Sequence, residues 1–143
     1  MRFDTVITNV RVVTGDSPDP INADIGITDG VISEVNPGLN LTEANEVIDA
    51  KGRIAFPGVV DAHEHWGIYN ELSKDAKSES MACAQGGVTS AITYIRTGQY
   101  YLNKGGRYED FFPEVLQACE GNAYVDYAFH LAPMMKEHID EIP

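Results

Sequence analysis

Cysteine, positive charge and long apolar runs are all scarce in this chain of 143 residues. Two cysteines, Cys83 and Cys119, are too few for the disulfide framework of a small secreted protein, so we expect free thiols. Ten basic residues stand against 22 acidic ones, and a net charge of −12 argues against nucleic acid or an anionic membrane as partner. No apolar run approaches the roughly 20 residues of a membrane span, and no signal peptide is recognisable. We therefore expect a cytoplasmic protein.

The remaining composition is ordinary for a globular protein. Hydrophobic residues make up 43% of the chain and charged residues 22%, and the length suffices for one modest domain with a buried core. Acidity of this degree keeps a chain soluble without naming a function. The function must therefore be sought in motifs.

Residues 1–55 have the pattern of a β-rich segment. β-branched residues dominate 5–13, and two further strand-like runs, 23–28 and 31–35, flank Asp29-Gly30. An Asp-Gly pair between such runs is a strong signal for a hairpin. A short strand is expected at 46–49.

From residue 56 onwards, the pattern changes to strands that alternate with helices. The predicted elements are a strand from residue 59, a helix over 72–85 that Gly86-Gly87 ends, a strand over 88–95, a helix over 109–120, a strand over 124–130, and a helix or loop over 134–142. Such alternation predicts parallel βαβ units. Three units do not close a (β/α)₈ barrel, which takes about 250 residues, so we expect either a fragment or a second polypeptide that supplies the rest.

The most informative stretch is FPGVVDAHEH, residues 56–65. It predicts a buried strand that ends in His63 and His65. Strand side chains alternate between faces, so the two imidazoles point the same way and Glu64 points to the other face. Two imidazoles at the mouth of a sheet or barrel can hold one divalent metal, which can produce hydroxide from water near neutral pH. The pattern therefore predicts a metal-dependent hydrolase.

Three further polar residues accompany this motif. Asp61 shares the face of the two histidines, and it either orients an imidazole or bonds to the backbone as a buried polar group. His130 ends the third predicted strand at the same end of the sheet, where we expect a hydrogen-bonded or orienting role in preference to metal ligation. His138 lies in a charged segment and is expected to be solvated.

Side chains that follow the first two predicted strands are candidates for substrate contact, because loops at the carboxyl ends of barrel strands line the pocket. Trp66 and Tyr69 either pack on an apolar substituent of a substrate or pack within the loop or a subunit contact. Arg96 either anchors an anion or pairs with a nearby carboxylate. Tyr100 is a candidate for the same wall.

The motif and its surroundings resemble the amidohydrolase superfamily. Residues 47–65 look like the start of its metal-bearing barrel, and the β-rich segment resembles the sandwich domain that precedes this barrel. Gly86-Gly87-Val88-Thr89 and the sequence DYAFH at 126–130 are similar to the cyclic amidohydrolases, the hydantoinase and dihydropyrimidinase group. The resemblance implies an α/β fold: a β-sandwich portion over 1–55, followed by the first three βα units of a TIM-type (β/α)₈ barrel over 56–143, incomplete in this chain.

The resemblance also implies a hydrolase of cyclic amide bonds that uses zinc or a similar divalent metal, two ions per complete site. His63 and His65 would ligate one ion, while a carboxylated lysine, further histidines and an aspartate base come from later strands. No catalytic residue is therefore assigned within the chain. The expected partners are a small cyclic amide, the remainder of the barrel on a partner chain or in further C-terminal sequence, and further copies in a homo-oligomer. The alternative is a non-catalytic amidohydrolase-like scaffold. The presence of both His63 and His65 argues against this alternative.

Overall fold

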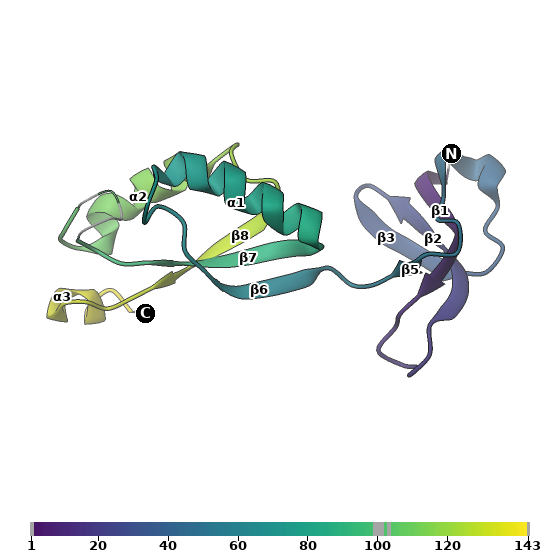
Figure 1. Cartoon of the computed structure of the whole chain (residues 1–143), viewed down its shortest axis with the longest axis horizontal. Coiled ribbons are helices and arrows are strands. Elements are labelled where there is room, and N and C mark those ends of the chain that lie inside the picture. The colour runs from purple at the N-terminus through teal and green to yellow at the C-terminus, as the bar shows by residue number, and fades with distance from the viewer. Residues whose placement is uncertain (1, 99–101, 103, 143) are drawn as a thin grey trace. The chain divides into compact units, whose positions relative to one another are not determined.

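Two units make up the computed structural model, which describes residues 2–98, 102 and 104–142 (Figure 1). Met1–Pro57 contains a sheet of mixed strand direction, and Gly58–Pro143 contains a parallel sheet with helices. Within the described ranges, no helix is long and apolar enough to cross a membrane. The fold is thus mixed α/β, with a sheet portion that precedes parallel βαβ units, as the pattern of the sequence predicts.

The first unit is built around its longest strand, β1. Its elements are β1 (Phe3–Val12), β2 (Ile21–Thr28), β3 (Val31–Asn36), the 3₁₀ turn η1 (Leu41–Glu43), β4 (Ala44–Asp49) and β5 (Ile54–Ala55). The strand order is β3-β2-β1-β4, and β5 pairs with the other end of β1. β2 runs antiparallel to β1 and β3, whereas β4 and β5 run parallel to β1.

The predicted hairpin at Asp29-Gly30 is confirmed. It connects β2 to β3, and both residues have positive φ, +52° for Asp29 and +74° for Gly30. Two consecutive positive φ angles define the type I′ turn, whose twist matches that of the flanking strands. The backbone conformations of these two residues therefore fit the connection.

Asp24 on β2 joins three parts of the first unit. Its side chain is 8% exposed, and Oδ1 accepts hydrogen bonds from Thr8 Oγ1 and Asn9 N–H, where β1 has a register shift and Asn9 has φ of +54°. Oδ2 accepts from the N–H groups of Gly38 and Leu39, after β3. Burial by itself raises the pKa of Asp24, but these hydrogen bonds outweigh it and leave the pKa below its ordinary value.

The second unit confirms the predicted parallel βαβ arrangement. Its elements are β6 (Val59–Glu64), α1 (Leu72–Gly86), β7 (Val88–Ile95), α2 (Tyr108–Cys119), β8 (Asp126–Leu131) and the short α3 (Lys136–Ile139). The strand order is β6-β7-β8, and both pairings are parallel. The predicted end of α1 is also correct, because Gly87 follows it in the left-handed conformation, with φ of +87°.

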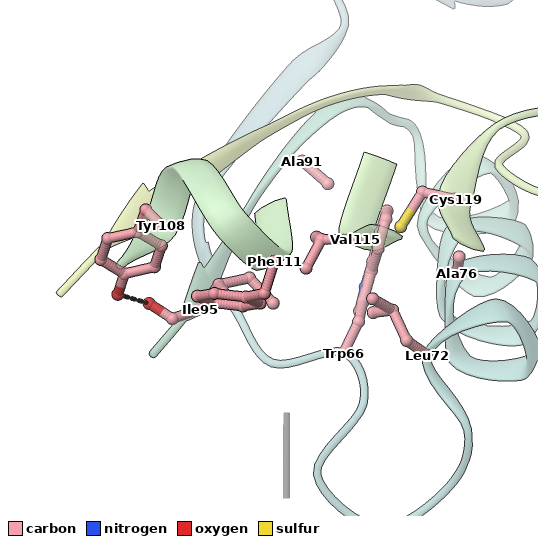
Figure 2. Packing of buried hydrophobic residues seen from close by; sticks show 9 residues of the cluster. All are labelled: Trp66, Leu72, Ala76, Ala91, Ile95, Tyr108, Phe111, Val115 and Cys119. Carbon is pink, nitrogen blue, oxygen red and sulfur yellow. Dashed lines mark hydrogen bonds between the residues drawn. The ribbon is translucent and has the colours of Figure 1, made fainter. Parts of the chain in front are cut away.

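The hydrophobic core of the second unit lies between the sheet and its helices. β7 alternates, so that Ala91, Thr93 and Ile95 are buried and the residues between them are partly exposed. Figure 2 shows the core cluster, to which Trp66, α1 and α2 also contribute. The helices therefore cover one face of the parallel sheet, and His63 and His65 lie on the opposite face.

The prediction of a solvated His138 is wrong. This residue is 2% exposed; its Nδ1 accepts the N–H of Met134, and its Nε2–H donates to the carbonyl of Gly106. Its ring also packs on Tyr108, with ring centroids 4.6 Å apart. The charged neighbours of His138 in the sequence concealed these contacts, of which those with Gly106 and Tyr108 come from a segment far away along the chain.

Replacing Asp24 by Asn should destabilise the first unit by about 2–4 kcal/mol at neutral pH, because the amide offers one acceptor oxygen to donors that now use two. The folded-state pKa is lowered, so the stabilisation is present above the unfolded pKa of about 4 and is lost as the pH falls through the lower folded value. Urea unfolding followed by amide NMR signals of β1 and β2, at neutral and acidic pH, measures both effects.

Asp16→Asn is the matched control, because Asp16 is exposed in a turn of the same unit. It should change the free energy of unfolding by less than about 0.5 kcal/mol. An Asp24→Asn variant as stable as this control at neutral pH would contradict the role of Asp24.

Candidate metal centre on the open face of the parallel sheet

The two histidines of the β6 motif converge, as strand alternation predicts. Their Nε2 atoms lie 3.1 Å apart and share a hydrogen bond, in which the tautomers decide which ring donates, and the rings meet edge to face with centroids 4.8 Å apart. Both side chains are exposed at the carboxyl end of β6, on the face that the helices leave free. Tyr94 of β7 lies beside them, with its ring centroid 6.3 Å from that of His63 and 5.5 Å from that of His65.

This geometry fits two ligands of one metal ion. Two nitrogens bound to the same tetrahedral zinc at roughly 2.0–2.1 Å lie roughly 3.3 Å apart. The observed separation of 3.1 Å between the Nε2 atoms is close to this value, and neutral imidazole is among the preferred ligands of zinc. His63 and His65 could therefore hold one metal ion together.

A group of three or more His, Cys, Asp or Glu side chains that could hold a metal is absent from the part of the chain that the structure describes. A catalytic zinc ordinarily has three protein ligands and one open position. The histidine pair could thus supply at most two of the protein ligands that such a zinc needs.

Asp61 contacts the backbone of β6. Its Oδ1 accepts a hydrogen bond of 3.0 Å from the N–H of His63. Of the two alternatives that the sequence left open for Asp61, the structure shows the backbone contact. His130, at the end of β8, reaches the same segment: its Nε2 lies 3.0 Å from the carbonyl oxygen of Ala62.

Glu64 faces the helices, as predicted from its position between the histidines. Its carboxylate accepts hydrogen bonds from Trp66 Nε1, at 2.8 Å, and from Cys83 Sγ of α1, at 2.7 Å. Burial, followed by the hydrogen bond and charge of Glu64, raises the pKa of Cys83 to about 12. The thiol is therefore protonated at neutral pH, and both groups stabilise the helix side of β6.

Comparison with known proteins identifies the same motif-bearing region. The D-hydantoinase of Geobacillus stearothermophilus is 35% identical over 141 residues, which are 96% of this chain and 28% of that protein. The allantoinase of Rubrobacter xylanophilus is 34% identical over 130 residues, 88% of this chain and 26% of that protein. A crystal structure of a D-hydantoinase superposes with a TM-score of 0.77 at 32% identity, over 96% of this chain and 29% of that chain.

The chain is homologous to the N-terminal part of the cyclic amidohydrolases. It spans less than a third of the length of the curated relatives that it matches. No protein-family model matches it. The predicted resemblance to the cyclic amidohydrolases is confirmed over this span.

The structure corrects one of the substrate contacts expected for a cyclic amidohydrolase. Trp66 is 0% exposed and lies in the core, where Figure 2 places it beside Leu72 and Val115. Its backbone N–H donates to Thr93 Oγ1, which lies on the helix side of β7. Trp66 therefore presents no surface to a substrate, because after the motif the chain turns its indole towards the helices.

Tyr69, Arg96 and Tyr100 are the other expected substrate contacts, and they differ in exposure or lie outside the described residues. Tyr69 is 92% exposed in the loop after β6. Arg96 directly follows β7, is partly buried, and forms no ion pair with the residues that the structure describes. Tyr100 lies outside the described residues. Tyr69 is exposed and Arg96 is partly exposed, so both side chains could contribute to the wall of a pocket.

Tyr94 and Thr93 contribute to the site although sequence reasoning did not single them out. Thr93 Oγ1 accepts the N–H of Trp66 and donates to the carbonyl of Glu64, so it holds the backbone on both sides of His65. The alternation of side chains along β7 could have pointed to both residues. Thr93 shares the buried face with Ile95, and Tyr94 lies on the face of the histidines.

Replacing Glu64 by Gln should lower the pKa of Cys83 towards its ordinary value, since both the hydrogen bond and the charge of Glu64 raise it. Alkylation of Cys83 by iodoacetamide should therefore begin at lower pH, as followed by peptide mass spectrometry. Glu79→Gln is the control, because Glu79 contributes only the smallest of the charge effects. Equal alkylation profiles in the two variants would contradict the contact between Glu64 and Cys83.

Proposed function

We propose that this chain forms the histidine-bearing wall of a metal-dependent cyclic amidohydrolase, which hydrolyses a C–N bond of a small cyclic amide. The single observation that carries the proposal is the approach of two Nε2 atoms to 3.1 Å at the carboxyl end of a parallel strand. Homology to a hydantoinase and an allantoinase over almost the whole chain supports the substrate class.

The residues of this chain have distinct tasks in that reaction. His63 and His65 would hold one ion, of zinc or a similar divalent metal, in a site that holds two when complete. Such a metal polarises an amide carbonyl and lowers the pKa of a bound water. Asp61 fixes the backbone at His63, and Thr93 fixes it on both sides of His65. Tyr69 and Arg96 are the proposed substrate-facing residues.

The open face of the parallel sheet supports a larger barrel. Parallel sheets are ordinarily covered on both faces, yet His63, His65 and His130 are exposed on the face that the helices leave free. We propose that residues 1–55 belong to a β-sandwich and residues 56–143 to a (β/α)₈ barrel. Further polypeptide, in the same chain or in a partner, would cover this face and bring the remaining ligands and the proton-transferring base.

Zinc binding by the 143-residue chain tests the histidine pair. Titration calorimetry with Zn²⁺ should detect binding to the unaltered chain, and His63→Ala or His65→Ala should weaken it by about tenfold or more, because a single imidazole then remains. Cys83→Ala is the control, since Cys83 lies on the helix side of β6. Zinc affinity that survives the loss of both histidines would refute the metal site.

Hydrolysis by the complete assembly tests the reaction. With the remaining barrel present, we expect two equivalents of metal per histidine pair by elemental analysis and turnover of a hydantoin, allantoin or dihydropyrimidine. His63→Ala should abolish turnover while β1–β5 stay folded. A freshly purified complete assembly without metal and without hydrolysis would support the non-catalytic scaffold instead.

A further inference from the structure

His130 lies near the histidine pair but directs its bonding nitrogen elsewhere. It is the penultimate residue of β8, on the open face, and it lies directly beside Tyr94 in the register between β7 and β8. Its Nε2 lies 3.0 Å from the carbonyl oxygen of Ala62. A carbonyl oxygen only accepts hydrogen bonds, so Nε2 of His130 carries a proton and donates. A nitrogen occupied in this way cannot ligate a metal.

The carbonyl that His130 contacts lies in an irregular part of β6. Asp61 pairs with Ala91 and Glu64 pairs with Thr93, so three steps along β6 are matched by two steps along β7. Such a bulge interrupts the hydrogen-bond ladder and redirects the side chains in it. Its residues therefore need other hydrogen-bond partners to keep one conformation.

Both polar groups of a single peptide unit in this bulge have such partners. The Ala62 carbonyl and the His63 N–H belong to the same peptide bond; the oxygen accepts from His130, and the N–H donates to Asp61. Because a peptide unit is planar, fixing its two ends fixes the plane that precedes the Cα atom of His63. The direction of the His63 side chain depends on that plane.

We propose that His130 is a positioning residue for the metal-binding pair. Its Nε2–H, together with the Asp61 carboxylate, holds the Ala62–His63 peptide in the orientation that brings the His63 imidazole to His65. His130 thus acts on the metal through the backbone of β6 and contacts neither metal nor substrate. The proposal rests on the proposed function, because it assigns His130 a task at the same site.

Two variants of His130 separate its hydrogen bond from its bulk. Gln carries an amide N–H near the place of Nε2, and Met has similar length without a donor. We expect His130→Met to weaken Zn²⁺ binding about 10–100-fold and His130→Gln to weaken it no more than about threefold, with equal melting temperatures. Equal Zn²⁺ affinities in the two variants, whether both weakened or both unchanged, would overturn the proposal.

NMR of the metal-free chain tests the same inference without zinc. In chain labelled with ¹⁵N in the histidine rings, His130 should show a protonated Nε2, and His130→Met should shift the backbone amide signal of His63 much more than His130→Gln does. An unprotonated Nε2 in His130, or equal shifts in the two variants, would overturn the positioning role, even if His130→Met fails to fold.

The two proposals fail in different ways. If a His63→Ala/His65→Ala double variant binds Zn²⁺ as tightly as the unaltered chain, the proposed metal site is wrong, while the NMR comparison still decides whether His130 orients the peptide. If the double variant loses zinc binding but His130→Met does not, the metal site holds and the role of His130 is refuted. A ring signal of His130 that responds to Zn²⁺ as strongly as those of His63 and His65 would make it a ligand.

Discussion

The conformation of β6 where it carries the histidines is the constraint on which the rest of the site depends. His63 and His65 lie on one face, although β6 shifts register against β7 between Asp61 and Glu64, and such a shift leaves backbone groups without their usual partners. Asp61 from the same strand, Thr93 from β7 and His130 from β8 each bind a backbone group within or next to the motif. These three contacts surround the pair of imidazoles, whose Nε2 atoms lie 3.1 Å apart.

The two faces of the parallel sheet have different chemistry, and residues 63–66 contribute side chains to both faces. On the helix side, Glu64 and Trp66 bond to each other and belong to the packing around α1 and α2. On the open side stand the two imidazoles and the ring of Tyr94. Because neighbouring residues of one strand face opposite ways, a rigid core on one side holds the candidate ligands steady on the other. The packed side of the sheet therefore supports the candidate ligands on its open side.

Much of the fold could be predicted because its signals are local. The Asp29-Gly30 hairpin follows from the backbone freedom of those two residues, and the end of α1 follows from a glycine in the left-handed conformation. The parallel arrangement follows from the alternation of strand-like and helix-like patterns along residues 56–143. The candidate ligands were also predictable, since two residues on one strand need only the period of that strand to share a face.

What the sequence by itself determined, then, is which elements form, how they connect, and that His63 and His65 lie side by side. The tertiary structure alone decided that Trp66 is buried, that His138 is buried against Gly106 and Tyr108, and that His130 reaches Ala62 from 68 positions away along the chain. The physical reason is that turns, caps and alternation depend on neighbours along the chain. Burial and hydrogen-bond partnership depend instead on which distant segments the fold brings together, and no local pattern of residues records that.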